Sequence, residues 1–126
     1  MTTKMVIDKK QATAFIRRTG RLKPGEMLQG TKELISDPLF KNMKKSLGDV
    51  SKADFSDIST DELEFHARYC RDKFKGLKIA LVAPSDLLYG LTRRFEILSE
   101  MDHLLVTRDM DEALSWLEVA LPEELQ

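Results

Sequence analysis

Hydrophobic and polar residues alternate along two short runs near the N-terminus, which flank the charged segment 8–10. Alternation with a period of two is typical of strands that bury one face, and a polar segment between two such runs is typical of a hairpin. The alternating apolar positions are Met5 and Ile7 in the first run and Ala12, Ala14 and Ile16 in the second. We therefore predict two antiparallel strands joined by a polar turn.

After Pro24 the spacing of the apolar residues becomes that of a helix. The residues at helical spacing are Met27, Thr31, Leu34 and Ile35. A residue that precedes a proline avoids the helical region, so this helix should end at Asp37. Gly30 weakens the prediction, because glycine inside a helix costs about 1 kcal/mol relative to alanine.

Residues 46–50 alternate again and predict a third strand, which a polar turn follows. Ser59, with Glu62 three residues later, has the form of a capping box, in which each side chain accepts a hydrogen bond from the backbone of the other residue. We predict a helix from about 60 to 75 that is closed by Gly76. Its buried stripe is expected to be Leu63, Ala67, Cys70 and Phe74.

The apolar run 77–83 ends at Pro84 and is followed by Ser85, a favoured N-cap residue. This order predicts a buried strand that turns into a helix with the core stripe Leu87, Leu91, Phe95 and Leu98. Residues 103–107 predict the last strand. The final helix is expected to begin near Asp109 and to stop before Pro122, with an apolar face of Met110, Ala113, Leu114, Leu117 and Leu121.

The predicted elements follow the order β-β-α-β-α-β-α-β-α. Strands that alternate with helices of this length imply right-handed crossovers and parallel strand pairs. We therefore predict an α/β fold with a mixed, mostly parallel five-stranded sheet and about four helices, in which the N-terminal hairpin adds an antiparallel edge. No repeat or linker divides the chain, so residues 1–126 are expected to form a single domain.

Composition narrows the classes of partner. The net charge is −1, from 20 basic and 21 acidic residues, so no general attraction to nucleic acid or to an anionic membrane is expected. Basic clusters at 17–21 and 41–45 are interpreted as solvated faces. Cys70 is the only cysteine, which excludes an intramolecular disulfide and a zinc site made of cysteines. Without an apolar run of ~20 residues or a signal-peptide pattern, we expect a cytoplasmic protein that is not integral to a membrane.

The turn at Ser85 is the first candidate binding surface. Ligands of open α/β sheets bind beyond the carboxyl ends of parallel strands, and the N-terminus of a helix attracts anions. Asp86 complicates anion binding, because its carboxylate fills that role internally. The residues one helical turn further along are therefore the better candidates for a binding surface.

That next turn contains Tyr89, Gly90 and Arg93. The guanidinium of Arg93 can hold a carboxylate or a phosphate bidentately, and a surface ion pair with Glu96 or Glu100 is the alternative. Glycine inside a helix is costly, so we expect Gly90 to pack closely against another element or a ligand.

No pattern for catalysis or metal binding is apparent, and no cofactor is expected. His66 and His103 lie far apart in the sequence without acidic ligands nearby, so structural roles are favoured over a metal site. Cys70 lies on a core stripe and should be a buried, inert thiol. Trp116 is expected to pack the last helix against the sheet rather than to anchor a partner.

Two stretches of the chain resemble known families. Residues 47–83, with Asp49, the turn Phe55-Ser-Asp-Ile-Ser59 and the strand that starts at Gly76-Leu-Lys, resemble STAS domains of anti-sigma-factor antagonists and sulfate transporters. Residues 83–96 and 108–117 resemble the SpoIIAA-like family, and shorter segments near residues 20 and 37 agree with it. The resemblance implies a STAS-like or CRAL-TRIO-like fold and a binding or regulatory role without an established catalytic activity.

The resemblance also points to a candidate switch turn at Asp57, Ser59 and Thr60. Anti-sigma antagonists are regulated by phosphorylation of a serine in an Asp-Ser-Ser-Gly turn. Here Ile58 replaces the first serine and Thr60 replaces the glycine. The predicted N-cap already explains Ser59, so the cap is favoured over a phosphorylation switch.

Three functional hypotheses are therefore open. The first is a non-enzymatic, STAS-like regulatory module that binds another protein and self-associates as a homodimer. The second is a carrier of a small apolar molecule, suggested by the CRAL-TRIO-like relationship and by Leu87, Leu88, Tyr89 and Phe95. An enzyme is the least favoured of the three, because no catalytic constellation is present.

Overall fold

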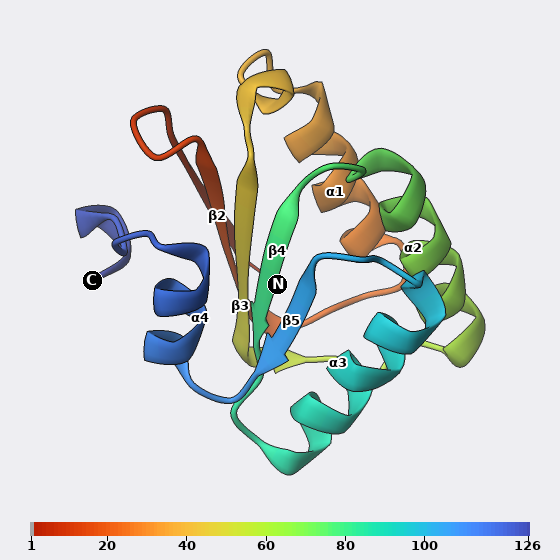
Figure 1. The fold of residues 1–126 in the computed structure, drawn as a ribbon. Coiled ribbons are helices and arrows are strands. Elements are labelled where there is room, and N and C mark those ends of the chain that lie inside the picture. Colours follow the sequence, from red (N-terminus) through yellow and green to blue (C-terminus); the bar gives the residue numbers. More distant parts are fainter. Residues whose placement is uncertain (1) are drawn as a thin grey trace.

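The computed structural model describes residues 2–126, which form a β-sheet with helices on both faces (Figure 1). The strands are β1 (Thr2–Asp8), β2 (Thr13–Arg21), β3 (Lys45–Asp54), β4 (Lys78–Val82) and β5 (Leu104–Thr107). The α-helices are α1 (Glu26–Ser36), α2 (Thr60–Lys73), α3 (Asp86–Ser99) and α4 (Met110–Leu117). Two short 3-10 helices, η1 (Phe40–Asn42) and η2 (Glu123–Leu125), complete the elements of this part of the chain.

The five strands lie in the order β1-β2-β3-β4-β5. β1 and β2 pair antiparallel as a hairpin, and the other three neighbouring pairs are parallel. The turn of the hairpin includes Ala12, whose φ of 50° places it in the left-handed region. The predicted element order and the mixed, mostly parallel five-stranded sheet are confirmed.

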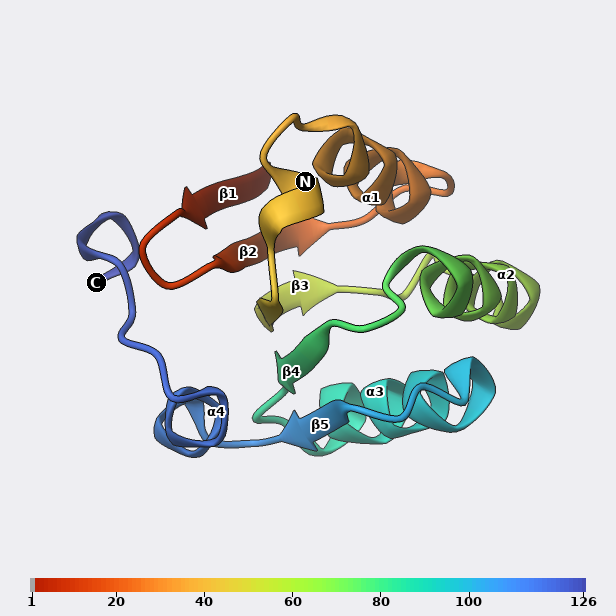
Figure 2. The ribbon, with the colours of Figure 1, turned by 45° about the horizontal axis from the view of Figure 1, so that its top comes forward.

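The two faces of the sheet are covered differently (Figure 2). The crossover helices α1, α2 and α3 lie together on one face, as expected when all parallel connections have the same hand. α4 lies on the other face against β4 and β5, and the C-terminal segment continues from it toward the β1–β2 hairpin. Each face therefore has its own hydrophobic core.

Alternation along β2 separates these two cores. Ala14 and Ile16 pack with the side chains of the three-helix face, whereas Phe15 is fully buried among residues of α4 and the C-terminal segment. Arg17 follows on the same side as Phe15, because its guanidinium donates to the carbonyl oxygen of Leu125 at 3.0 Å. The period of two therefore places Arg18 on the three-helix side.

β3 is longer than the sequence pattern predicted. The prediction ended the strand at residue 50, but β3 continues to Asp54, and its last residues pair with the end of β2 after a register shift. Ala53 is buried in a small cluster with Leu22 and Met27, which explains why this polar segment stays extended.

The predicted buried stripe of α3 is wrong at Leu87, whereas Phe95 packs against the core as predicted. Leu87 is 82% exposed, and the buried residues of the helix are Leu88, Thr92 and Ser99. Both hydroxyls are satisfied within the helix, since Thr92 donates to the carbonyl of Leu88 and Ser99 to that of Glu96. A threonine or serine whose hydroxyl donates a hydrogen bond to its own helix can be buried, but a hydrophobicity pattern counts it as a polar, exposed position.

The ends of two other helices also differ from the prediction. α4 stops at Leu117, and Glu118 adopts a left-handed C-cap conformation, so Leu121 lies outside the helix although it still packs against the same core. α2 stops at Lys73, while Gly76, at φ 82°, forms part of the turn that leads into β4. The predicted stripe of α2 is buried as expected.

Candidate functional site

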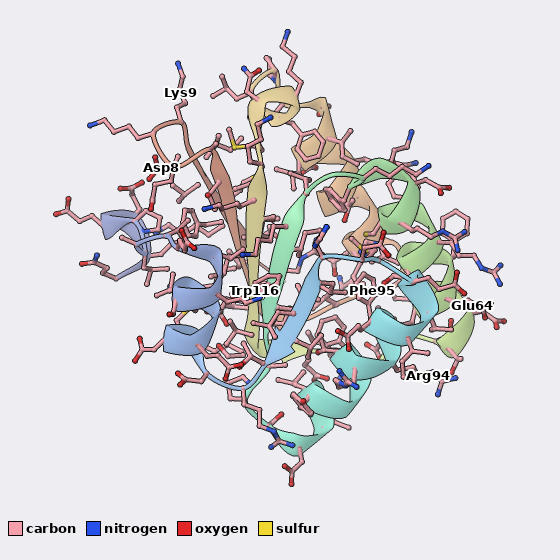
Figure 3. The ribbon with its side chains drawn as sticks, in the orientation of Figure 1. Asp8, Lys9, Glu64, Arg94, Phe95 and Trp116 are labelled. Carbon is pink, nitrogen blue, oxygen red and sulfur yellow. The ribbon has the colours of Figure 1, made fainter. Side chains whose placement is uncertain are left out.

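A cavity of about 130 Å³ lies between the sheet and the three helices α1, α2 and α3. Its wall is mostly apolar and includes Ile16, Leu34, Leu63, Ile79, Leu91 and Phe95. None of the residues that line it is exposed. Figure 3 shows Phe95 directed from α3 toward the sheet, while the neighbouring Arg94 points outward.

Arg18 is a charged residue in this mostly apolar wall. Its side chain is half-buried on β2, and its guanidinium lies over α1, where a Cβ on Gly30 would stand 3.4 Å from one of the terminal nitrogens. Burial lowers the pKa of Arg18 from its ordinary value, although an arginine stays protonated at neutral pH. Within residues 2–126, no side chain or backbone oxygen forms an ion pair or hydrogen bond with the guanidinium of Arg18.

His66 is the second polar group of the cavity wall. It is buried on α2, and its Nε2 lies 3.5 Å from both the Thr31 hydroxyl and the Cys70 sulfur. Its Nδ1 is buried without a hydrogen-bond partner in the described part of the chain. The ring also faces Phe95, with 5.9 Å between the ring centroids.

The electrostatics of the cavity leave the positive charge of Arg18 uncompensated. Burial, assisted by the charge of Arg18, lowers the pKa of His66 to about 4, so its imidazole is neutral at pH 7. Burial raises the pKa of Cys70 to about 12, so it is a thiol rather than a thiolate. Among the described residues that line the cavity there is no aspartate or glutamate. The site can therefore attract an anion.

Interpretation of the sequence missed Arg18, because the basic cluster 17–21 was assigned to a solvated face. Each arginine has a different environment. Arg17 pairs with the buried Asp49 at 3.1 Å, and Arg21 forms a bidentate pair with Asp57 at 2.7 and 2.8 Å. The alternation of β2 was the available signal, since Arg18 follows Ala14 and Ile16 at intervals of two.

The turn predicted as a binding surface lies away from the cavity. Ser85 caps α3 as expected, its hydroxyl accepting from the backbone N–H of Leu88 at 3.1 Å. Asp86 and Tyr89 both meet Arg108, which donates to the Asp86 carboxylate at 2.6 Å and lies 4.4 Å from the Tyr89 ring centroid. Arg108 was not among the sequence candidates, and its position directly after β5 was the only indication of it.

The other two residues of that surface are also external. Arg93 is exposed and pairs with Glu96, which is the surface ion pair weighed as the alternative. Gly90 is exposed, and a Cβ there would meet no atom within 4 Å. The expectation of close packing at Gly90 is wrong.

The candidate switch turn has a structural role. Ser59 caps α2 by accepting from the backbone N–H of Glu62 at 3.1 Å, and Asp57 is held by Arg21. Thr60 is the first, exposed residue of the helix. The capping box is not reciprocal, because the Glu62 carboxylate accepts from the backbone N–H of Gly25 at 2.8 Å and so joins the starts of α1 and α2.

Trp116 packs as predicted. It lies between α4 and the sheet, half-buried in the second core (Figure 3). Lys78 of β4 holds it in place, because its ammonium group lies 4.4 Å from the ring centroid and donates to the Trp116 carbonyl at 2.7 Å. His103 is exposed beside the start of β5.

Comparison with known proteins does not assign this chain to a family. No protein-family model matches the sequence, and no curated protein is significantly similar to it. Across residues 2–126, no helix combines the length and apolar character needed to cross a bilayer. The same residues contain no cluster of three or more histidine, cysteine or acidic side chains placed to hold a metal ion.

Proposed function

We propose that this protein binds a small, largely apolar molecule in the cavity between the sheet and helices α1, α2 and α3. The cavity itself is the observation that carries the proposal. Protein interiors are packed as densely as organic crystals and contain few voids larger than a water molecule. A space of about 130 Å³ with a mostly apolar lining and a few polar groups is therefore a candidate ligand site.

The size of the cavity sets the size of the ligand. An engineered apolar cavity of about 150 Å³ binds benzene, so a volume of about 130 Å³ suits a compact body of similar size. A void that stays empty also reduces stability. A bound ligand would restore the van der Waals contacts that such a space lacks.

Filling the cavity tests the proposal directly. Thr92 lines it, and its hydroxyl bonds only its own helix, so Thr92→Leu adds apolar volume to the cavity without orphaning a partner in another element. We expect benzene to raise the melting temperature of the wild-type protein and to have no effect on Thr92→Leu. The variant alone should be more stable than wild type by about 1 kcal/mol.

Ile97→Thr on the exposed side of the same helix is the matched control, and it should keep the wild-type response to benzene. An equal benzene response in Thr92→Leu would contradict binding in this cavity. Binding in the cavity would also be contradicted if neither benzene nor a second small apolar probe, 1-hexanol, raised the melting temperature of the wild-type protein.

The regulatory, protein-binding module implied by the family resemblance is the second candidate. Three large apolar side chains support it, since Phe65 of α2 and Leu87 and Ile97 of α3 are 59%, 82% and 68% exposed. Exposed apolar side chains of this size would suit contacts with a partner protein or a second copy of the chain if they gather in one patch. Sedimentation of the wild-type protein and of Leu87→Ser distinguishes self-association from a monomer.

A further inference from the structure

We infer that the ligand of the cavity is a monocarboxylate with a compact apolar body, and that Arg18 binds its carboxylate. The inference rests on the proposed function, because it names the chemistry of the molecule that occupies the cavity. Three observations carry it: the unpaired guanidinium of Arg18, the unpartnered Nδ1 of His66 and the otherwise mostly apolar lining of the cavity that both residues share.

The guanidinium is placed as a binding group rather than as a structural one. The Arg18 side chain is half-buried, yet the part of the chain that the structure describes offers its guanidinium no carboxylate partner. The absence of a side chain at Gly30 gives the guanidinium room against α1. The planar fork of an arginine matches a carboxylate bidentately, and such charge-assisted pairs are about twice as strong as neutral hydrogen bonds.

His66 provides a second donor. The Thr31 hydroxyl and the Cys70 thiol are both hydrogen donors, and both lie 3.5 Å from Nε2. In the tautomer in which Nε2 accepts from these two groups, the ring proton is on Nδ1. Nδ1 is the one buried side-chain polar atom without a partner in residues 2–126. A carboxylate in the cavity would supply the acceptor that this N–H lacks.

Charge and volume restrict the ligand class further. One guanidinium compensates one negative charge, and the remaining wall is too apolar to replace the hydration of a phosphate dianion. A body of about benzene size with one carboxylate satisfies both limits. Benzoate is therefore the appropriate probe, and benzamide is its uncharged counterpart of nearly the same shape.

Calorimetric titration of the full chain at pH 7 with benzoate and with benzamide tests the inference. We expect wild type to bind benzoate at least tenfold more tightly than benzamide. Arg18→Met should lose this preference while still binding benzamide or benzene, which shows that the variant folds and keeps its cavity. Arg93→Met, which removes an exposed arginine outside the cavity, should behave like wild type.

The outcomes separate the inference from the proposed function. If wild type binds benzamide as tightly as benzoate, or if Arg18→Met keeps the preference, the carboxylate assignment is overturned and the apolar cavity stands. If no benzene-sized compound binds wild type, the proposed function fails and the assignment fails with it. His66→Leu adds an independent readout, since loss of its N–H should weaken benzoate binding severalfold and leave benzene binding unchanged.

Discussion

Acidification from pH 7 to about pH 4.5 is expected to lower the free energy of unfolding by about 2 to 3 kcal/mol through His66 alone. The pKa of His66 is lowered to about 4 in the folded protein, first by burial and then by the charge of Arg18. In the unfolded chain a histidine titrates near its ordinary value of about 6.5.

The sign follows from proton binding. Between pH 6.5 and pH 4 the unfolded chain takes up a proton at His66 that the folded protein does not, so stability rises with pH in this window. The full contribution is present above about pH 6.5 and is lost as the pH falls toward 4. The groups that face the ring, Thr31, Cys70, Phe95 and Arg18, include no acid that would stabilise an imidazolium.

Urea denaturation at a series of pH values measures this effect in wild type, His66→Leu and His103→Gln. His66→Leu should have a nearly flat stability between pH 6.5 and 4.5, whereas His103→Gln, which changes an exposed ring, should keep the wild-type slope. Asp8, Asp54 and Asp57 have lowered pKa values, so their contributions are lost at lower pH. An unchanged slope in His66→Leu would contradict the buried, neutral state of the ring.

Two adjacent arginines are expected to have opposite effects on stability. Arg17→Met should lower the free energy of unfolding by about 3 kcal/mol, because it leaves the buried carboxylate of Asp49 without its charged partner. The same change also removes the hydrogen bond to the Leu125 carbonyl. Arg18→Met should raise the free energy of unfolding by about 1 kcal/mol, because it replaces a partly desolvated, unpaired charge with an apolar side chain.

Chemical denaturation of the two single variants at pH 7 without ligand measures both effects under one condition. The comparison is matched, because the residues are neighbours on β2 and the substitution is the same. Destabilisation of similar size in both variants would mean that Arg18 supports the fold. That result would contradict the assignment of Arg18 as a ligand-binding group without a structural role.

The order of elements could be predicted because it depends on local periodicity. Hydrophobic alternation located the strands, and capping residues such as Ser59 and Ser85 located the helix starts that the structure contains. The length of β3 could not be predicted, because its last residues are held by pairing with β2 and by burial of Ala53 against Leu22 and Met27. Pairing between distant segments leaves no signal in a local pattern.

The cavity could not be predicted from the sequence for two physical reasons. Thr92 and Ser99 interrupt the apolar stripe of α3 although both are buried, which displaced the predicted face toward Leu87. Arg18 has the composition of a surface residue, and only its spacing from Ile16 indicates that it points inward. The sequence-based candidates instead have partners outside the cavity, since Arg108 contacts Asp86 and Tyr89 and Glu96 pairs with Arg93.

The position of a bound carboxylate can be tested with the methionines of the chain. Met27 and Met101 line the cavity, whereas Met5 lies on the edge strand and Met110 packs in the core on the opposite face. Titration of benzoate into protein labelled with ¹³C at the methionine methyl groups is therefore the most direct measurement. Saturable shifts at Met27 and Met101, with Met5 and Met110 unchanged, are the result that binding in the cavity predicts. Shifts only at Met5 or Met110, or no shift at any methionine, would contradict it.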